Sequence, residues 1–363
     1  MNRVFNFSPG PSTLPLEILY KIKKDLYNWN NLGCSIMEIS HRNKNFLKIA
    51  SELKNFLIEI IKVPKTYEIL FLHGGARAQF SAIPMNLLNR NNCADYINSG
   101  YWSLQAINEA KKYCNINISD VIYKNNLGKV SVKKMKYWNI SPNTSYIHYC
   151  LNETANGISI YEKPNFLKNI IVADLSSIIL SKNIKVKYFD VIYACSQKNI
   201  GIPGFTLVII KKKIIKNKKN VPSFLSYHCI SRNNSLFNTP STFSWYVAWL
   251  ICKWIKKKGG IKKIQKVNKK KAKLIYDVID KNKIYINDIS TENRSLTNIV
   301  FKIKNKNLEK KFFIESKNNG FYFLNGHKAI GGIRISLYNA MTIKGAKKIS
   351  KFMDEFAKVY INF

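Results

Sequence analysis

The chain has 363 residues, of which 46% are hydrophobic and 13% aromatic, and its formal net charge is +38. This composition excludes an intrinsically disordered protein, and it provides enough apolar side chains for a large core that we expect to divide between two domains. The charge is compatible with a polyanionic partner, but only seven of the 59 basic residues are arginines. We therefore attribute the charge to lysine enrichment through A/T-rich codons, and expect no specific nucleic-acid partner.

The lysines occur along most of the sequence, with runs at 211–213, 256–258 and 269–271 that we expect to be solvated. The N-terminus reaches a Pro/Gly turn without an apolar segment, and the most apolar stretch, 245–252, is too short to span a bilayer. Seven scattered cysteines and five dispersed histidines show no paired or metal-ligand spacing. These features predict reduced thiols, no metal site and a cytoplasmic location.

Helix and strand patterns alternate along most of the chain. In chain order, we expect a helix at 16–29, a helix at about 45–62, a strand at 69–72, a helix that runs through Leu88, strands at 94–97, 145–149, 170–174, 191–194 and 206–210, and helices at 245–257 and 261–280. Such alternation is typical of an α/β fold with a mainly parallel sheet. We predict a large α/β domain at 15–262 and a smaller α+β domain made of 1–14 and 263–363.

A lysine follows one predicted strand and an aspartate ends another. Lys198 lies in a short polar loop just after the strand at 191–194, and Asp174 ends the strand at 170–174. The carboxyl ends of neighbouring parallel strands lie at one edge of a sheet. Pyridoxal phosphate (PLP) needs such a pair, since the lysine forms a Schiff base and the aspartate keeps the pyridine nitrogen protonated. With 52 lysines in the chain, however, the pairing alone is a weak signal.

A glycine-rich turn joins the strand at 69–72 to the helix that follows it. The sequence His73-Gly74-Gly75-Ala76-Arg77 places free backbone N–H groups at the start of a helix, where the helix dipole favours an anion. A Gly-Gly pair is more often plain turn chemistry. At this point the turn therefore supports an anion site only as a hypothesis.

Eight motifs carry a family resemblance, in order and with near-constant spacing over essentially the whole chain. They are NFSPGP (6–11), MEISHR (37–42), HGGARAQF (73–80), YW (101–102), HYCLNET (148–154), QKNIG (197–201), FNTP (237–240), and GH (326–327) followed by RISLYNA (334–340). With these motifs the chain resembles the phosphoserine aminotransferases, which are fold-type I PLP enzymes. The resemblance implies the fold of those enzymes, with a large PLP-binding domain and a small C-terminal domain.

The resemblance also assigns cofactor-binding roles. It implies that Lys198 bonds to PLP and moves a proton at the substrate Cα, and that Asp174 pairs with the pyridine N–H. The other residues implied to hold PLP are Ala76, Arg77, Trp102, Thr154, Gln197 and, from the neighbouring subunit of a homodimer, Asn238 and Thr239. For Trp102 the alternative is an ordinary core tryptophan. Beside a cationic pyridinium and partly desolvated, Lys198 is expected to have a lowered pKa.

A second set of basic residues is implied to bind the substrate. Arg334 would bind the α-carboxylate as a bidentate fork. The pocket for the phosphate or side-chain carboxylate would be formed by His41, Arg42, His327 and Lys328, some of them across the dimer interface. Each of these could instead be an ordinary surface base. Lys328 stands where arginine is usual and gives a point charge in place of a fork, and Pro9 removes one backbone donor.

The implied activity is a ping-pong transfer of an amino group. L-Glutamate would leave as 2-oxoglutarate, and 3-phosphohydroxypyruvate would become O-phospho-L-serine in serine biosynthesis, with the 4-phosphohydroxy-L-threonine step of pyridoxine biosynthesis as a possible second role. Two alternatives stay open. One is a PLP aminotransferase for small uncharged amino acids, against which the paired basic motifs argue. The other is a basic nucleic-acid-binding protein on an inactive scaffold, against which the intact Lys198, Asp174 and Arg334 argue.

Overall fold

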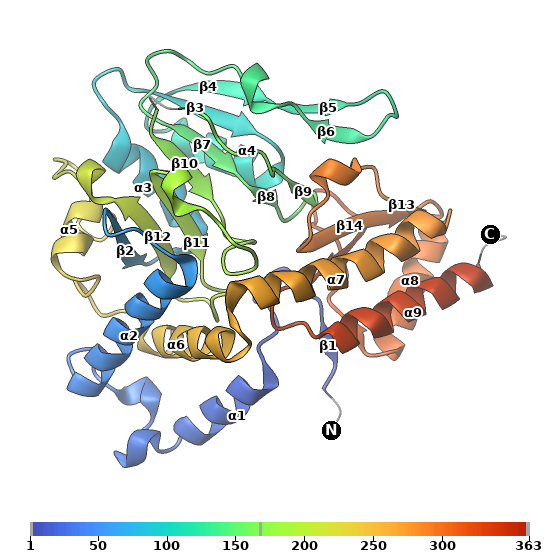
Figure 1. Cartoon of the computed structure of the whole chain (residues 1–363), viewed down its shortest axis with the longest axis horizontal. Coiled ribbons are helices and arrows are strands. Elements are labelled where there is room, and N and C mark those ends of the chain that lie inside the picture. Colours follow the sequence, from blue (N-terminus) through green and yellow to red (C-terminus); the bar gives the residue numbers. More distant parts are fainter. Residues whose placement is uncertain (1–2, 167–168, 361–363) are drawn as a thin grey trace.

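The computed structural model describes residues 3–166 and 169–360, and its larger part is built on a seven-stranded sheet (Figure 1). In spatial order the strands are β2 (Tyr67–Leu72), β12 (Thr206–Lys211), β11 (Val191–Cys195), β10 (Ile171–Asp174), β7 (Ile147–Cys150), β3 (Cys93–Asn98) and β4 (Asn115–Asp120). Every neighbouring pair is parallel except the two that β12 makes with β11 and β2. The predicted α/β fold with a mainly parallel sheet is therefore confirmed.

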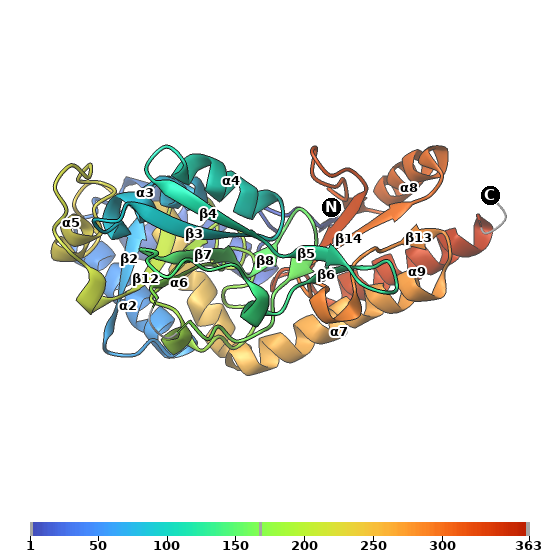
Figure 2. The same ribbon diagram turned by 90° about the horizontal axis from the view of Figure 1, so that it is seen from above.

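Helices cover both faces of this sheet, because its strands are apolar on both sides. Along β2, Ile69 and Phe71 pack into one core, while Leu70 and Leu72 pack into another. The first core is closed by α1 (Leu16–Asp25), α2 (Lys44–Ile61) and α6 (Thr242–Lys257), and the second by α3 (Gly75–Leu87), α4 (Tyr101–Ala110) and α5 (Tyr227–Arg232). Figure 2 shows α4 and α6 on opposite sides of the sheet.

The long helix α7 (Gly260–Lys281) leads to the C-terminal part of the molecule (Figure 1). There, β13 (Tyr285–Ile286), β14 (Asn298–Ile303) and β16 (Ile333–Ser336) form an antiparallel sheet, accompanied by α8 (Lys306–Asn318) and α9 (Ile343–Val359). The N-terminal strand β1 (Phe5–Asn6) pairs with β15 (Phe321–Tyr322), and Phe7 packs into the same core. The chain thus returns its first residues to its C-terminal part, while the predicted domain boundaries stay a prediction.

Short elements complete the described chain. Two hairpins pair β5 (Ile122–Lys124) with β6 (Val130–Val132) and β8 (Asn152–Glu153) with β9 (Ile158–Ser159). The 3₁₀ turns are Trp29–Asn31, Ile36–Glu38, Met135–Tyr137, Val186–Tyr188, Lys212–Ile214 and Thr291–Asn293. The helix expected at 16–29 is shorter than predicted and ends at Asp25. Asn28 is extended, with a φ angle of −145° and a ψ angle of 94°, so the helix cannot continue to Trp29.

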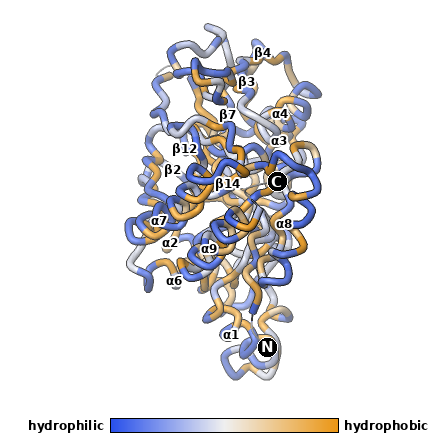
Figure 3. The backbone as a smooth tube through the Cα atoms, turned by 90° about the vertical axis from the view of Figure 1, so that its right-hand side faces the viewer, coloured by the Kyte–Doolittle hydropathy of each residue, from blue (hydrophilic) through white to orange (hydrophobic). Residues whose placement is uncertain are grey.

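The hydropathy pattern agrees with these three cores. Figure 3 shows apolar residues on the inward sides of helices such as α9 and hydrophilic residues on their outer sides. On α9, Ile349, Met353 and Phe356 are buried at helical spacing, so that one stripe of the helix packs against the C-terminal core. Among the described helices, none combines the length and the apolar character that a membrane span requires.

Candidate active site

Lys198 and Thr154 meet at the carboxyl edge of the central sheet. Lys198 follows β11 and Thr154 follows β8, which lies just beyond the end of β7. The Lys198 Nζ atom donates a hydrogen bond to Thr154 Oγ1 at 2.8 Å. The Lys198 loop is held from the N-terminal segment as well, since Ser12 Oγ donates to the Lys198 carbonyl oxygen at 2.6 Å. The Lys198 amine therefore has a fixed position at the carboxyl edge of the sheet, as the sequence analysis predicted.

Asp174 ends the strand next to β11 and is buried. Its Oδ1 atom accepts a hydrogen bond from the Ser176 backbone N–H at 2.8 Å. Burial raises the pKa of Asp174, and Ser176, the Lys198 ammonium and the Tyr193 hydroxyl oppose that rise. A cation placed beside this carboxyl group would favour its ionised form. This is the environment in which an aspartate can hold a protonated ring nitrogen.

Behind Asp174 lies a polar pair for which the sequence analysis assigned no role. Tyr193 is the residue opposite Asp174 in the parallel ladder of β10 and β11. Its hydroxyl bonds to His148 Nε2 at 2.9 Å, and the His148 ring stacks on Tyr96 with 4.7 Å between ring centroids. Burial lowers the pKa of His148 to about 3, so this imidazole is neutral. The sequence held a signal for this pair, because His148 opens one of the eight motifs. Its neighbours Tyr193 and Tyr96 lie on other strands, so the motif alone could not reveal the contact.

The protein's own groups raise the pKa of the Lys198 amine. Burial by itself would lower this pKa, but Tyr338, Cys195 and Asp174 outweigh the effect of burial. The expected lowering placed a pyridinium cation beside the amine, and such a cation would disfavour the ammonium form. A lowered pKa of Lys198 in the presence of PLP therefore stays a prediction.

Trp102 is positioned by a buried carboxylate that the sequence analysis did not single out. Glu153 accepts hydrogen bonds from the backbone N–H groups of Trp102 and Ser103, both at 2.8 Å. These donors belong to the first turn of α4, where a carboxylate both caps free N–H groups and complements the helix dipole. Within the described chain, the Trp102 indole Nε1 is buried without a hydrogen-bond partner. The centroid of its ring lies 5.8 Å from the Arg77 guanidinium carbon and 6.2 Å from the centroid of the His327 ring.

The glycine-rich turn opens α3 at the same edge of the sheet. Gly74 and Gly75 have φ angles of 84° and 66°, a conformation that favours glycine. A Cβ atom on Gly74 would lie 2.4 Å from the Ala78 Cβ atom, so this position also lacks space. Ala76 and Arg77 follow in the first helical turn, where backbone N–H groups are free to bind an anion.

Arg334 reaches this group from β16, in the C-terminal part of the molecule. Arg334 is 6% exposed, and its Nη1 atom lies 3.5 Å from the Thr154 carbonyl oxygen. Its Nε atom is buried and has no hydrogen-bond partner among residues 3–166 and 169–360. Burial lowers the pKa of Arg334, yet a guanidinium stays charged in proteins. None of the ion pairs among the described residues involves Arg334. A buried, unpaired guanidinium is suited to bind a carboxylate.

His327 joins the group, and other predicted residues do not. The His327 ring lies 4.1 Å from the Tyr101 ring, and burial together with the nearby Arg334 lowers its pKa. Asn238 Nδ2 contacts His73 Nε2 at 3.2 Å, next to the glycine-rich turn. Gln197 precedes Lys198 in the chain, and its carbonyl oxygen accepts a hydrogen bond from the Ser12 backbone N–H at 2.9 Å. The other four predicted residues make no hydrogen bond or ring contact with Lys198, Thr154, Trp102 or Arg334 within the described chain. They are His41, Arg42, Thr239 and Lys328, of which the last three are exposed.

The donor set fits PLP. A fixed amine, a buried carboxylate, the Trp102 indole ring and a glycine-rich helix start lie at one edge of the mainly parallel sheet. In that order, they suit the aldehyde, the pyridine nitrogen, the ring face and the phosphate of PLP. A buried guanidinium stands beside them for a substrate carboxylate. The fold and this arrangement define the class of PLP-dependent aminotransferases.

The chain belongs to the class-V aminotransferase family, whose model matches residues 4–349. It is 57% identical over 362 residues to a protein named phosphoserine aminotransferase from Wigglesworthia glossinidia brevipalpis, covering 99% of this chain and all of that one. A protein of the same name from Buchnera aphidicola (Schizaphis graminum) is 51% identical over 361 residues, again 99% of this chain and all of that one.

Solved structures agree with these relatives. A phosphoserine aminotransferase structure whose title concerns radiation damage of the Schiff base superposes with a TM-score of 0.95 at 38% identity, covering 99% of this chain and 100% of that one. A PLP-bound phosphoserine aminotransferase from Trichomonas vaginalis gives a TM-score of 0.91 at 35% identity, covering 97% of this chain and 99% of that one. The family resemblance predicted from the motifs is confirmed.

Proposed function

We propose that the protein is a phosphoserine aminotransferase that uses PLP to exchange an amino group between L-glutamate and 3-phosphohydroxypyruvate. The observation that carries this function is the convergence of two cations on Thr154. The Lys198 Nζ atom bonds its hydroxyl at 2.8 Å, and Arg334 Nη1 lies 3.5 Å from its carbonyl oxygen. An amine for the cofactor and a guanidinium for the substrate carboxylate thus flank one residue. Full-length relatives at 51–57% identity support the substrate assignment.

Each residue of the Lys198 group has its own role in the proposed reaction. Bound PLP supplies an electron sink for the exchange of the amino group. Lys198 holds the cofactor at rest, and its Nζ atom then moves a proton at the substrate Cα. Asp174 holds the ring nitrogen protonated, supported by Tyr193 and His148 from behind. Arg334 orients the substrate by its α-carboxylate, so that the Cα–H bond points toward Lys198.

The second anionic group of the substrate, a phosphate or a side-chain carboxylate, needs further cations. His327 stands beside Arg334 and Tyr101 at the mouth of this group, and we assign it with Lys328 to the phosphate or side-chain carboxylate. Within the described residues of one chain, His41 and Arg42 make no hydrogen bond or ring contact with Lys198, Thr154 or Arg334, and Asn238 and Thr239 are exposed. In our proposal a homodimer brings these four residues to the partner's site. The enzyme would act in the cytoplasm in serine biosynthesis, and we propose the 4-phosphohydroxy-L-threonine step as a second role.

The two other functions considered for the sequence have less support. An aminotransferase for uncharged amino acids has the same fold, as an alanine–glyoxylate aminotransferase from Nostoc sp. shows with a TM-score of 0.75, but at only 14% identity. A nucleic-acid-binding protein on an inactive scaffold has no need of a fixed Lys198 amine or of a buried, unpaired Arg334.

A spectral titration of the PLP-loaded protein tests the proposal. Glutamate and O-phosphoserine, added separately, should each remove the visible absorption band of bound PLP, and alanine should leave it in place. Bleaching by alanine at similar concentrations would instead support the specificity for uncharged amino acids. A folded protein that develops no visible band with PLP would contradict the role of Lys198.

A further inference from the structure

Lys271, in the middle of α7, is fully buried, with 0% of its surface exposed. The sequence analysis expected the whole lysine run at 269–271 to be solvated. That expectation is wrong for Lys271, while Lys269 and Lys270 are exposed. A buried ammonium costs free energy unless polar groups surround it. Its surroundings therefore indicate what this lysine does.

Three backbone carbonyls surround the ammonium. Lys271 Nζ donates to the carbonyl oxygens of Leu337 at 3.2 Å, Tyr338 at 2.8 Å and Met341 at 2.9 Å. We call residues 337–341, between β16 and α9, the carbonyl loop. An ammonium has three N–H donors and no acceptor, so it matches three carbonyls one for one. No ion pair among the described residues includes Lys271, and burial lowers its pKa to about 7.

The carbonyl loop touches the active site on its other side. Its Asn339 backbone N–H donates to Asn199 Oδ1 at 3.0 Å, and Asn199 is the residue after Lys198. The Tyr338 hydroxyl raises the pKa of the Lys198 amine and so lies within its electrostatic reach. The loop also continues directly from β16, the strand that carries Arg334. A shift of this loop would therefore move Tyr338 and Arg334 relative to Lys198.

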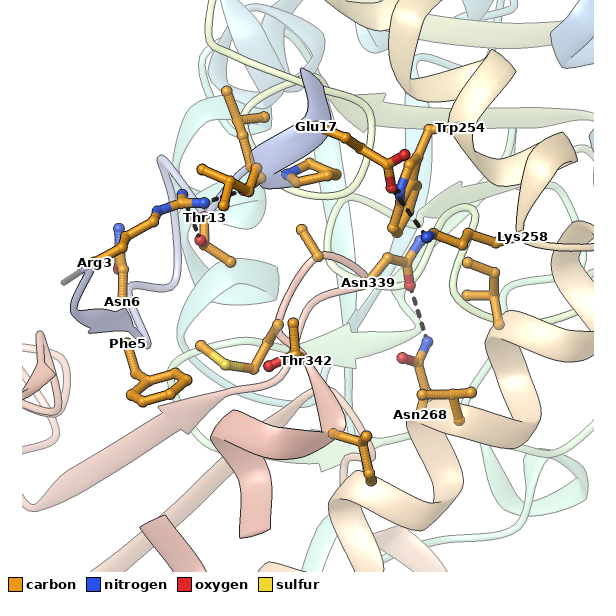
Figure 4. A pocket seen from close by; sticks show the side chains of 18 of the residues that line it. Arg3, Phe5, Asn6, Thr13, Glu17, Trp254, Lys258, Asn268, Asn339 and Thr342 are labelled. Carbon is orange, nitrogen blue, oxygen red and sulfur yellow. Dashed lines mark hydrogen bonds and ion pairs between the residues drawn. The ribbon is translucent and has the colours of Figure 1, made fainter. Parts of the chain in front are cut away.

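The carbonyl loop borders a cavity on one flank. This cavity of about 790 Å³, lined by the loop residues Asn339, Ala340 and Met341, opens between the N-terminal segment, α6 and α7 (Figure 4). Figure 4 shows Asn339 next to Asn268 of α7 at the cavity wall, and Asn268 Nδ2 donates to Asn339 Oδ1 at 2.9 Å. Because a cavity offers no van der Waals contacts to its lining, the polar anchors from α7 add to the packing of Leu337 and Met341 in the C-terminal core in holding the loop.

We propose that Lys271 is a positioning residue for the aminotransferase reaction, whose ammonium fixes the carbonyl loop and thereby places Arg334 and Tyr338 beside Lys198. This inference rests on the function proposed above. In that function, Lys271 contacts neither the substrate nor the cofactor. Its effect reaches the reaction through the backbone of the loop, so it should change substrate binding and the titration of the active-site lysine rather than the chemistry as such.

The test compares Lys271→Met with Lys270→Met, its exposed neighbour on the same helix, in the PLP-loaded enzyme. Methionine keeps the length of the side chain and removes all three donors. For Lys271→Met we expect the KM for glutamate to rise about tenfold, the size of effect that a misplaced charge-assisted hydrogen bond produces. The pH at which the visible band of bound PLP changes should shift, because a displaced carbonyl loop changes the surroundings of the Lys198 nitrogen. Lys270→Met should match the unmodified enzyme in both.

The outcomes separate the two proposals. If the unmodified enzyme binds PLP and reacts with glutamate, and Lys271→Met keeps its KM and its spectral pH while losing only stability, the positioning role is wrong. If Lys271→Met does not fold, Asn339→Ala loosens the same loop from the cavity side, and an unchanged KM there would equally overturn the proposal. Failure of the unmodified enzyme to react with glutamate would overturn the proposed function instead.

Discussion

Neutral His148, buried behind Asp174, should make the protein sensitive to acid. Burial lowers the pKa of His148 from 6.5 to about 3, so between these pH values the unfolded chain binds a proton that the folded chain excludes. Stability from this group is therefore present above pH 6.5 and is lost as the pH falls toward 3. Since one pKa unit corresponds to about 1.4 kcal/mol, the full loss is about 5 kcal/mol.

The assay compares the unmodified chain with His148→Gln, which keeps a polar partner for Tyr193 but cannot titrate. Between about pH 7 and about pH 4.5, linkage predicts that His148 alone removes about 2.5 kcal/mol of the free energy of unfolding. Urea unfolding of cofactor-free protein at both pH values measures this loss. Between the two pH values, the free energy of unfolding should fall by about 2.5 kcal/mol less in His148→Gln than in the unmodified chain. His228→Gln, at a partly exposed histidine, serves as the control and should lose as much as the unmodified chain. Equal losses in His148→Gln and the unmodified chain would refute the argument that His148 is held neutral.

Three further predictions concern the active-site group. Lys198→Ala should abolish the visible band of bound PLP and lower kcat by more than about 10³-fold, while circular dichroism shows an unchanged fold; a variant that keeps the band would contradict the assignment. Arg334→Lys replaces a bidentate fork by a point charge and should raise the KM for glutamate about 10- to 100-fold with a smaller change in kcat, as steady-state kinetics would measure. Glu153→Gln weakens the cap of α4 and should lower the free energy of unfolding by urea by about 1–2 kcal/mol. Glu109→Gln, at the C-terminal end of α4, should lower it less.

The sequence predicted the elements wherever local patterns decide them. Strand β2 and helices α2, α6 and α7 lie close to their predicted ranges, because apolar periodicity and glycine stops act over a few residues. Lys198 and Asp174 were placed together because the carboxyl ends of parallel strands share one edge of a sheet. The antiparallel course of β12 was not predicted, since strand direction depends on how the chain crosses the sheet and not on the strand's own residues.

Long-range contacts decided the rest. The sequence could not show that Glu153 caps α4 or that His148 reaches Tyr193, because these partners lie about fifty residues apart and meet only when strands pair. Nor could it distinguish Lys271 from its exposed neighbours, since the carbonyls that bind it belong to a loop more than sixty residues later. The sequence by itself determined the family and the strands, and it predicted which residues carry the PLP chemistry. Only the tertiary structure decided their partners, because burial and electrostatic environment are properties of the packed chain and not of any local segment.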